Sequence, residues 1–296
     1  MEARLEFKGT GGELFGKLIG GAILTAITGG IYGPWFQVSV NKYVYSTTTL
    51  RGTKRGDLKL EFTGSGGELF KIGFLGMLLT MLTLGIYSPW MIANLTRFYT
   101  DHSTATAVDG TRFRLKTNLT GGDIFKTFLV GALLSAITLG IYLPWMICRI
   151  QQLVAQRTDL IENDRPIGRI DFVGRGADLF VIMLVGQILT MLTLGIYFAW
   201  LQVKMLRFFA QGTEVRIGNT LIRGDFTGTG GELFKITLVG AILTGLTLGI
   251  YAFWFLAKTL AFQLGNTVYR ASSAAAATTG PARSGIGIPA RPQPSL

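Results

Sequence analysis

The chain has 296 residues, of which 49% are hydrophobic and only 15% charged, and its formal net charge is +11. Soluble proteins carry about 25% charged residues, and the mean hydropathy here is positive, at +0.42. Composition therefore argues against an ordinary soluble protein and favours a membrane protein.

Five windows of the sequence contain no charged residue, and each is longer than the roughly 20 residues that cross a bilayer. The windows are Leu18 to Asn41, Ile72 to Thr96, Thr127 to Cys148, Leu179 to Val203 and Ile236 to Ala257. They predict a multi-pass membrane protein. The N-terminus shows no cleavable signal peptide, so the first window is expected to act as its own insertion signal.

The windows belong to an internal repeat that the chain contains five times. Its cores are residues 11–35, 66–90, 121–145, 176–200 and 230–254, and each ends on one of the five tryptophans of the protein. A fixed period of about 55 residues indicates one supersecondary unit repeated along the chain. Residues 1–270 are expected to form one five-repeat domain.

The second copy shows the elements in order. Residues 58–62 alternate apolar and charged side chains, which predicts a short strand, and the glycines of TGSGG then break it. Glu68 opens a helix that runs to Gly85, about 27 Å at 1.5 Å per residue, and this predicts a transmembrane helix.

The motif GIYSPW predicts a turn at the bilayer surface, because Gly ends helices, Pro begins them and Tyr and Trp prefer the interface. A second helix is expected at about 89–104, either spanning or lying in the interface. Asp109-Gly110 between two alternating runs then predicts a β-hairpin.

The connections between repeats are all basic, which predicts that they share the cytoplasmic side. Residues Ala3–Phe7 and Asn266–Arg270 are two half-hairpins at opposite ends of the chain. Unpaired strand edges are costly, so these two strands are expected to pair and close the repeats into a pseudo-fivefold ring. The fold class expected is an all-α integral membrane protein with small β-hairpins, and residues 271–296 are expected to form a disordered cytoplasmic tail.

Small and hydroxyl residues recur on one face of each first helix, a set we call the Gly-Thr-Thr seam. Two interpretations stay open: close packing of helices, or the lining of a central pore. The seam consists of Gly21, Thr25, Thr28, Gly76, Thr80, Thr83, Gly131, Ser135, Thr138, Gly186, Thr190, Thr193, Gly240, Thr244 and Thr247.

An acidic residue opens each first helix, at Glu13, Glu68, Asp123, Asp178 and Glu232. Under ring closure these carboxylates would form an acidic ring. They either compensate the helix dipole or form a mouth that attracts cations. Lysines three residues later in three of the repeats favour the first explanation.

Aromatic pairs are expected to anchor the protein at the membrane interface. They are Tyr32 and Trp35, Tyr87 and Trp90, Tyr142 and Trp145, Tyr197 and Trp200, and Tyr251 and Trp254. The dispersed Lys and Arg residues predict contact with anionic lipid headgroups rather than with nucleic acid. Gln187 is an unshared polar residue in the middle of a helix and needs a partner.

No Ser/His/Asp set, Cys/His cluster or HExxH motif is present, so we expect no enzymatic activity, no metal and no cofactor. The single cysteine, Cys148, is expected in the packing, and the lone histidine, His102, on the surface. The leading hypothesis for function is a pore or transporter for ions or small solutes. The alternative is a membrane scaffold that displays a ring of hairpins to a partner.

The block at Phe62 to Trp90, with Arg97 and Phe113, and its copy at Phe226 to Trp254 resemble the YjgN-like family of bacterial inner-membrane proteins, a domain of unknown function. LTLGIY at Leu82, Leu192 and Leu246 and ITLGIY at Ile137 carry the likeness, which covers about residues 1–270. The chain departs from the family pattern in the regular spacing of its five copies. The resemblance implies a bacterial inner-membrane location and brings no catalytic or ligand-binding residues.

Overall fold

The computed structural model describes residues 2–273, and within them each repeat runs strand, helix, helix, strand. The first helices are α1 (Gly11–Ile27), α3 (Gly66–Leu82), α5 (Gly121–Ile137), α7 (Gly176–Leu192) and α9 (Gly230–Leu246). The second helices are α2 (Gly33–Ser46), α4 (Ser88–Asp101), α6 (Leu143–Gln156), α8 (Phe198–Gly212) and α10 (Ala252–Gly265). The tail predicted after residue 270 lies, from residue 274 onward, outside the described residues.

The strands do not stay in separate hairpins, and the all-α fold class predicted from the sequence is wrong. They join in one closed antiparallel barrel in the order β1-β10-β9-β8-β7-β6-β5-β4-β3-β2. The strands are β1 (Glu2–Phe7), β2 (Thr48–Thr53), β3 (Gly56–Phe62), β4 (Ser103–Ala107), β5 (Arg112–Thr117), β6 (Thr158–Glu162), β7 (Arg165–Phe172), β8 (Thr213–Ile217), β9 (Thr220–Phe226) and β10 (Thr267–Ser273). Each strand uses both edges, since β3 pairs with β2 of its own hairpin and also with β4, beyond two helices.

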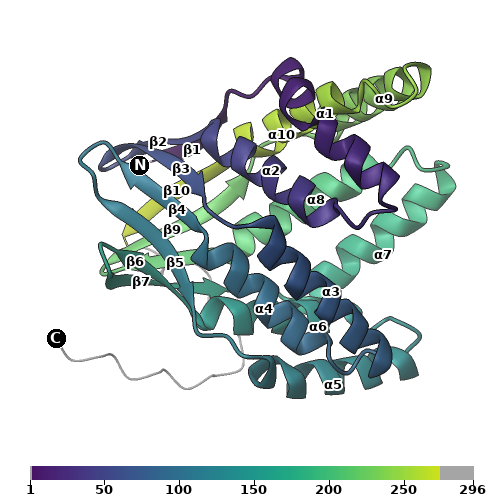
Figure 1. Ribbon diagram of the computed structural model, residues 1–296. Helices are drawn as coiled ribbons and strands as arrows, with labels where there is room; N and C mark the ends of the chain where they lie inside the picture. The colour runs from purple at the N-terminus through teal and green to yellow at the C-terminus, as the bar shows by residue number, and fades with distance from the viewer. Residues whose placement is uncertain (1, 274–296) are drawn as a thin grey trace.

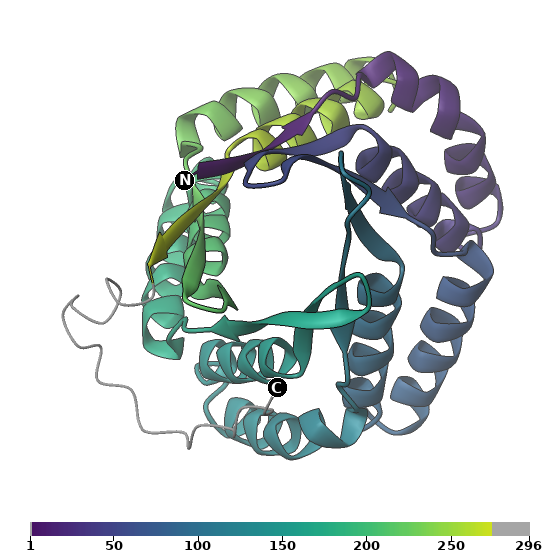
Figure 2. The ribbon, with the colours of Figure 1, turned by 90° about the vertical axis from the view of Figure 1, so that its left-hand side faces the viewer.

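The pairing expected between the two ends of the chain is confirmed. Strand β1 is antiparallel to β10, with Glu2 opposite Arg270 and Arg4 opposite Val268. Seen from the barrel end, the strands form an inner ring and the helices surround it (Figure 2). The barrel therefore has no free edge, which removes the cost of unpaired backbone groups.

The helices also form a closed ring, in which each helix packs between its two neighbours in sequence and α1 packs on α10. The tryptophan at the start of each second helix lies against the first glycine of the next first helix. Trp35 contacts Gly66 in this way, and Trp254 contacts Gly11, which closes the circle. The helices extend from one end of the barrel (Figure 1).

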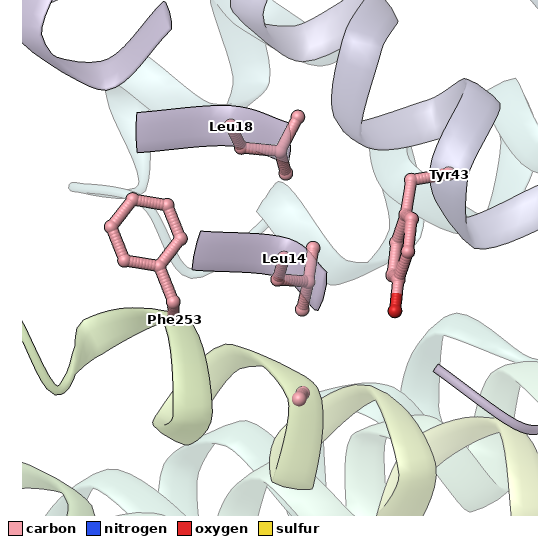
Figure 3. Packing of buried hydrophobic residues seen from close by; sticks show 5 residues of the cluster. Leu14, Leu18, Tyr43 and Phe253 are labelled. Carbon is pink, nitrogen blue, oxygen red and sulfur yellow. The ribbon is translucent and has the colours of Figure 1, made fainter. Parts of the chain in front are cut away.

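The buried side chains of each repeat lie between three helices and a strand. In the first repeat, Leu14 and Leu18 of α1 are enclosed by Tyr43 of α2 and Phe253 of α10 (Figure 3). Phe62, Phe172 and Phe226 anchor the strands to the second helices in the same manner. The core is thus spread around the ring in five similar clusters.

Among residues 2–273, none of the helices combines the length and the apolar character that crossing a membrane requires. The transmembrane helices predicted from the charge-free windows are therefore wrong. The interhelical turn lies where the sequence predicts it, but the first helix ends before it, at Leu82 rather than Gly85, and has 17 residues.

Candidate functional site

The turn between the two helices of each repeat forms the tip of the helical end. A seam threonine caps it: the Thr83 hydroxyl donates to the Leu79 carbonyl at 2.7 Å and accepts from the Tyr87 N–H at 3.0 Å. Two residues in left-handed backbone follow, Leu84 at φ 50° and Gly85 at φ 93°. The same arrangement recurs in the other repeats, at Thr28, Thr138, Thr193 and Thr247.

The remaining seam residues lie in the contact between the two helices of one repeat. Gly76 faces Met91, and Gly186 faces Leu201, so closely that an added Cβ would clash. The Thr190 hydroxyl donates to the Gly186 carbonyl at 2.7 Å, as Thr25 does to Gly21. The structure thus places the seam residues between the two helices of each repeat, where they permit close packing of these helices. The hydroxyls of Thr80, Ser135 and Thr244 are buried there without a hydrogen-bond partner among the described residues.

In the first three repeats, the acidic residue holds the first turn of the first helix to the end of the second helix, whereas Glu232 of the fifth repeat accepts from the Thr229 N–H at 3.1 Å. In the first repeat the Tyr43 hydroxyl donates to Glu13 at 2.7 Å. Burial, and then the Glu13 carboxylate, raise the pKa of Tyr43 to about 12. In the second repeat His102 Nε2 lies 3.3 Å from Glu68, and in the third Arg157 lies 2.6 Å from Asp123.

Two further residues from the sequence analysis have definite places. His102, expected on the surface, is only partly exposed and packs on Phe98 with 4.9 Å between ring centroids. Cys148 is buried in the core, as expected of a packing residue.

The tyrosines and tryptophans form stacked pairs at the start of the second helices. Tyr87 stacks on Trp90 with ring centroids 5.8 Å apart. Each tryptophan also contacts a phenylalanine of the next repeat, such as Phe125 for Trp90. The Lys204 and Lys258 ammonium groups donate to the hydroxyls of Tyr197 and Tyr251. These aromatic rings therefore join successive repeats.

Large apolar side chains cover the outside of the first helices and the helical tips, and we call this surface the apolar belt. The turn leucines are almost wholly exposed: Leu84 by 95%, Leu139 by 94%, Leu194 by 96% and Leu248 by 95%. The belt also includes Ile27, Leu82, Ile137, Leu192, Leu246, Ile31, Ile86, Ile141, Ile196 and Ile250. Monomeric soluble proteins rarely expose apolar surfaces of this extent, and such surfaces mark contact with membranes or other proteins.

The strands carry charged side chains on the face opposite the helices. Because Phe62 packs on the helices and side chains alternate along a strand, Lys59 and Glu61 face the barrel axis. By alternation and cross-strand register, this charged inner face consists of Glu2, Arg4, Glu6, Arg51, Asp57, Lys59, Glu61, Arg112, Arg114, Lys116, Asp159, Arg169, Asp171, Glu214, Arg216, Arg223, Asp225 and Arg270.

Ion pairs cross the strand boundaries of the charged inner face. Arg270 binds Asp225 at 2.8 Å and Glu2 at 3.3 Å, which joins β9, β10 and β1. Hydrogen bonds from Arg4 and then Arg270 lower the pKa of Glu2. Arg223 binds Glu214 at 2.8 Å. Within residues 2–273, Lys59, Arg112, Lys116 and Arg169 make no ion pair.

Two adjoining pockets lie among α7, α8, α9 and α10, with volumes of about 630 and 390 Å³. Both are lined by Phe198, Gln202 and Gln263, and the smaller pocket also by Gln187. The sequence singled out Gln187 but missed the other two glutamines. The sequence could have identified Gln202 because a polar residue there replaces an apolar one: the equivalent residue is Ile92, Ile147 or Leu256 in three other copies.

A family model described as "Bacterial protein of unknown function (DUF898)" matches residues 2–55, 57–121, 168–219 and 222–275. The chain belongs to the DUF898 family. The matched segments correspond to four of the five repeats, and each contains both helices of a unit together with all or part of the strand on either side. The DUF898 unit therefore begins at or within a strand.

A curated relative, "Inner membrane protein YjgN" from Salmonella typhimurium, is 34% identical over 82 residues. The match covers 28% of this chain and 20% of the relative, so the two proteins are similar over about a fifth of the relative's length. It supports the YjgN-like resemblance found in the motifs. No solved structure matches the DUF898 chain.

Proposed function

We propose that this protein is a membrane protein of the bacterial inner membrane that inserts its helical tips and apolar belt into the bilayer. The observation that carries the proposal is the exposure of Leu84, Leu139, Leu194 and Leu248. A leucine costs free energy both in left-handed backbone and in water, and insertion into hydrocarbon offsets the second cost. The relative named an inner membrane protein supports the location.

Replacing the four turn leucines with asparagine tests the insertion. Asparagine tolerates left-handed backbone, and these side chains make few contacts with the rest of the protein, so the fold should persist. Each buried leucine contributes about 1.5–3 kcal/mol to partitioning. Four leucines together contribute at least about 6 kcal/mol, so the quadruple variant should lose about ten-thousandfold or more in binding to sedimented liposomes.

Val108 provides the matched control, because it is 83% exposed but lies in the turn between β4 and β5, away from the helical tips. Val108→Asn should leave liposome binding unchanged. Equal binding of the quadruple variant and the wild type would contradict the insertion. Vesicles with and without phosphatidylglycerol would show whether anionic headgroups attract the dispersed Lys and Arg residues.

The charged inner face favours a second candidate function, an opening along the ring axis for small inorganic anions. The barrel has ten strands, more than the roughly eight whose interior the side chains just fill. Cations outnumber anions on the charged inner face, and Lys59, Arg112, Lys116 and Arg169 have no ion-pair partner in the described part of the chain. Unpaired cations raise the local concentration of anions.

Ion flux in liposomes under a potassium chloride gradient tests this second candidate. The wild type should show a reversal potential that favours chloride. Changing Lys59, Arg112, Lys116 and Arg169 together to glutamine should shift that potential towards zero. Insertion without flux would contradict the opening and would favour the alternative of a membrane scaffold that presents the barrel to a partner.

A further inference from the structure

The paired pockets of α7–α10 contain polar groups without a visible partner. Among the described residues, no hydrogen bond is made by the side-chain amides of Gln187, Gln202 or Gln263. The other residues that line the pockets are mostly apolar, with Phe198 shared by both. Gln202 and Gln263 are half-buried, whereas Gln187 is exposed. A half-buried amide beside apolar surface costs free energy unless it finds a hydrogen-bond partner, and a bound molecule can supply one.

The chemistry of the pockets restricts what that molecule can be. No acidic, basic or histidine side chain lines either pocket, so nothing there would pair with a charged ligand. The amides offer both donors and acceptors, and Thr237 adds a hydroxyl to the larger pocket; the Thr259 hydroxyl donates to the Phe255 carbonyl and can only accept from a ligand. The larger volume of about 630 Å³ lies within the usual range of small-molecule sites.

The equivalent position in the first repeat shows what the same residue does without such a pocket. Gln37 occupies the place of Gln202, two residues after the tryptophan. Its side-chain amide donates to Asn41 at 3.1 Å, and so it is satisfied within α2. Gln202 has leucine in place of that asparagine, at Leu206, so an internal partner is absent from the corresponding position of α8.

We infer that these pockets bind an uncharged amphiphile with one hydrocarbon chain, whose hydroxyl or carbonyl oxygens hydrogen-bond Gln202 and Gln263. The hydrocarbon chain of this ligand lies against the apolar walls contributed by α8, α9 and α10. The adjoining position of Gln187 provides a third amide for a head group with several oxygens. Leu194 and Ile196 of the apolar belt line the larger pocket, so the site adjoins the surface proposed to insert into the membrane and rests on that proposal, but it does not depend on the axial opening.

Native mass spectrometry of the full chain in detergent, with 1-monooleoylglycerol as probe, tests the inference. The wild type should retain one probe molecule. Gln202→Leu with Gln263→Leu should weaken binding about tenfold, the amount expected for losing two neutral hydrogen bonds. Oleate, which has the same chain but a negative head, should bind at least tenfold more weakly than the probe.

Gln37→Leu is the matched control and should leave probe binding unchanged. A circular dichroism spectrum equal to that of the wild type shows that the double variant is folded, and a probe-induced rise in melting temperature gives a second measure of binding. Equal retention by the double variant and the wild type would overturn the site. Equal binding of oleate and 1-monooleoylglycerol would overturn the requirement for an uncharged head.

Discussion

Tyr43 shows how one polar group can be held inside an apolar cluster. Its ring lies beside Leu14 and Leu18, while its hydroxyl accepts from the Thr10 N–H at 2.9 Å and donates to Glu13. The other repeats place Phe98, Leu153, Phe208 or Phe262 at this position. The first repeat therefore uses a tyrosine to fix the start of α1, at the point where the ring closes on α10.

The raised pKa of Tyr43 predicts a loss of stability at high pH. Its folded-state pKa of about 12 exceeds the ordinary value of about 10, so its contribution is complete below pH 10 and is lost as pH rises through 12. Between pH 10 and 12, ionisation of Tyr43 should lower the free energy of unfolding of the wild type by about 2–3 kcal/mol. Tyr43→Phe should not show this loss. Thermal unfolding across this range measures it, with Tyr142→Phe, in an interhelical turn, as control. An unchanged slope in Tyr43→Phe would contradict the assignment.

At the scale of elements, the contact between a second helix and the next first helix depends on the absence of a side chain. Trp35 lies so close to Gly66 that a Cβ there would be 2.4 Å from its Cδ1 and 2.7 Å from its Cα. The backbone of Trp35 cannot move without moving α2. This explains why each first helix begins with glycine although glycine lowers helix stability.

Gly66→Ala should therefore destabilise the protein by about 2–3 kcal/mol, the upper part of the range for overpacking. A methyl group added at the neighbouring Gly67 would have no atom within 4 Å. Gly67→Ala should therefore leave the stability unchanged or raise it by up to about 1 kcal/mol. Chemical denaturation of the two variants gives the comparison. Similar stabilities for both would show that the Trp35 contact does not constrain α3.

For the whole molecule, the decisive contact is the one between β1 and β10, at opposite ends of the chain. Their ion pair between Glu2 and Arg270, 3.3 Å long, lies on the charged inner face with both side chains exposed. Opposite residues in an antiparallel pair have Cα atoms about 4.5–5.5 Å apart, within the range that a disulfide bridges.

A protein with Glu2→Cys and Arg270→Cys should form an intramolecular disulfide on mild oxidation. Cys148 is buried and should not compete. Non-reducing electrophoresis would show one faster-migrating monomer band. A protein with Glu2→Cys and Lys116→Cys, two positions on strands that are not neighbours, is the control and should stay uncrosslinked. Failure of the first pair, or dimers alone, would contradict ring closure within one chain.

The sequence alone determined the features that depend on residues close together in the chain. The tryptophan spacing defined five repeats, Asp109-Gly110 defined a hairpin that the structure contains, and the motif around Leu82 identified the family. The two half-hairpins also predicted that β1 and β10 pair. These features follow from turn chemistry, periodicity and the need to satisfy strand edges.

Only the tertiary structure decided how the repeats combine. The pairing of β3 with β4 joins residues separated by α3 and α4, and no local pattern distinguishes one partner from another. The charge-free windows favoured helices that cross the membrane, although the sequence also predicted the turn at GIYSPW; the first helix ends at Leu82, ahead of the left-handed backbone at Leu84 and Gly85. The barrel, the charged inner face and the glutamine pockets arise from contacts between distant segments, and so they required the folded ring.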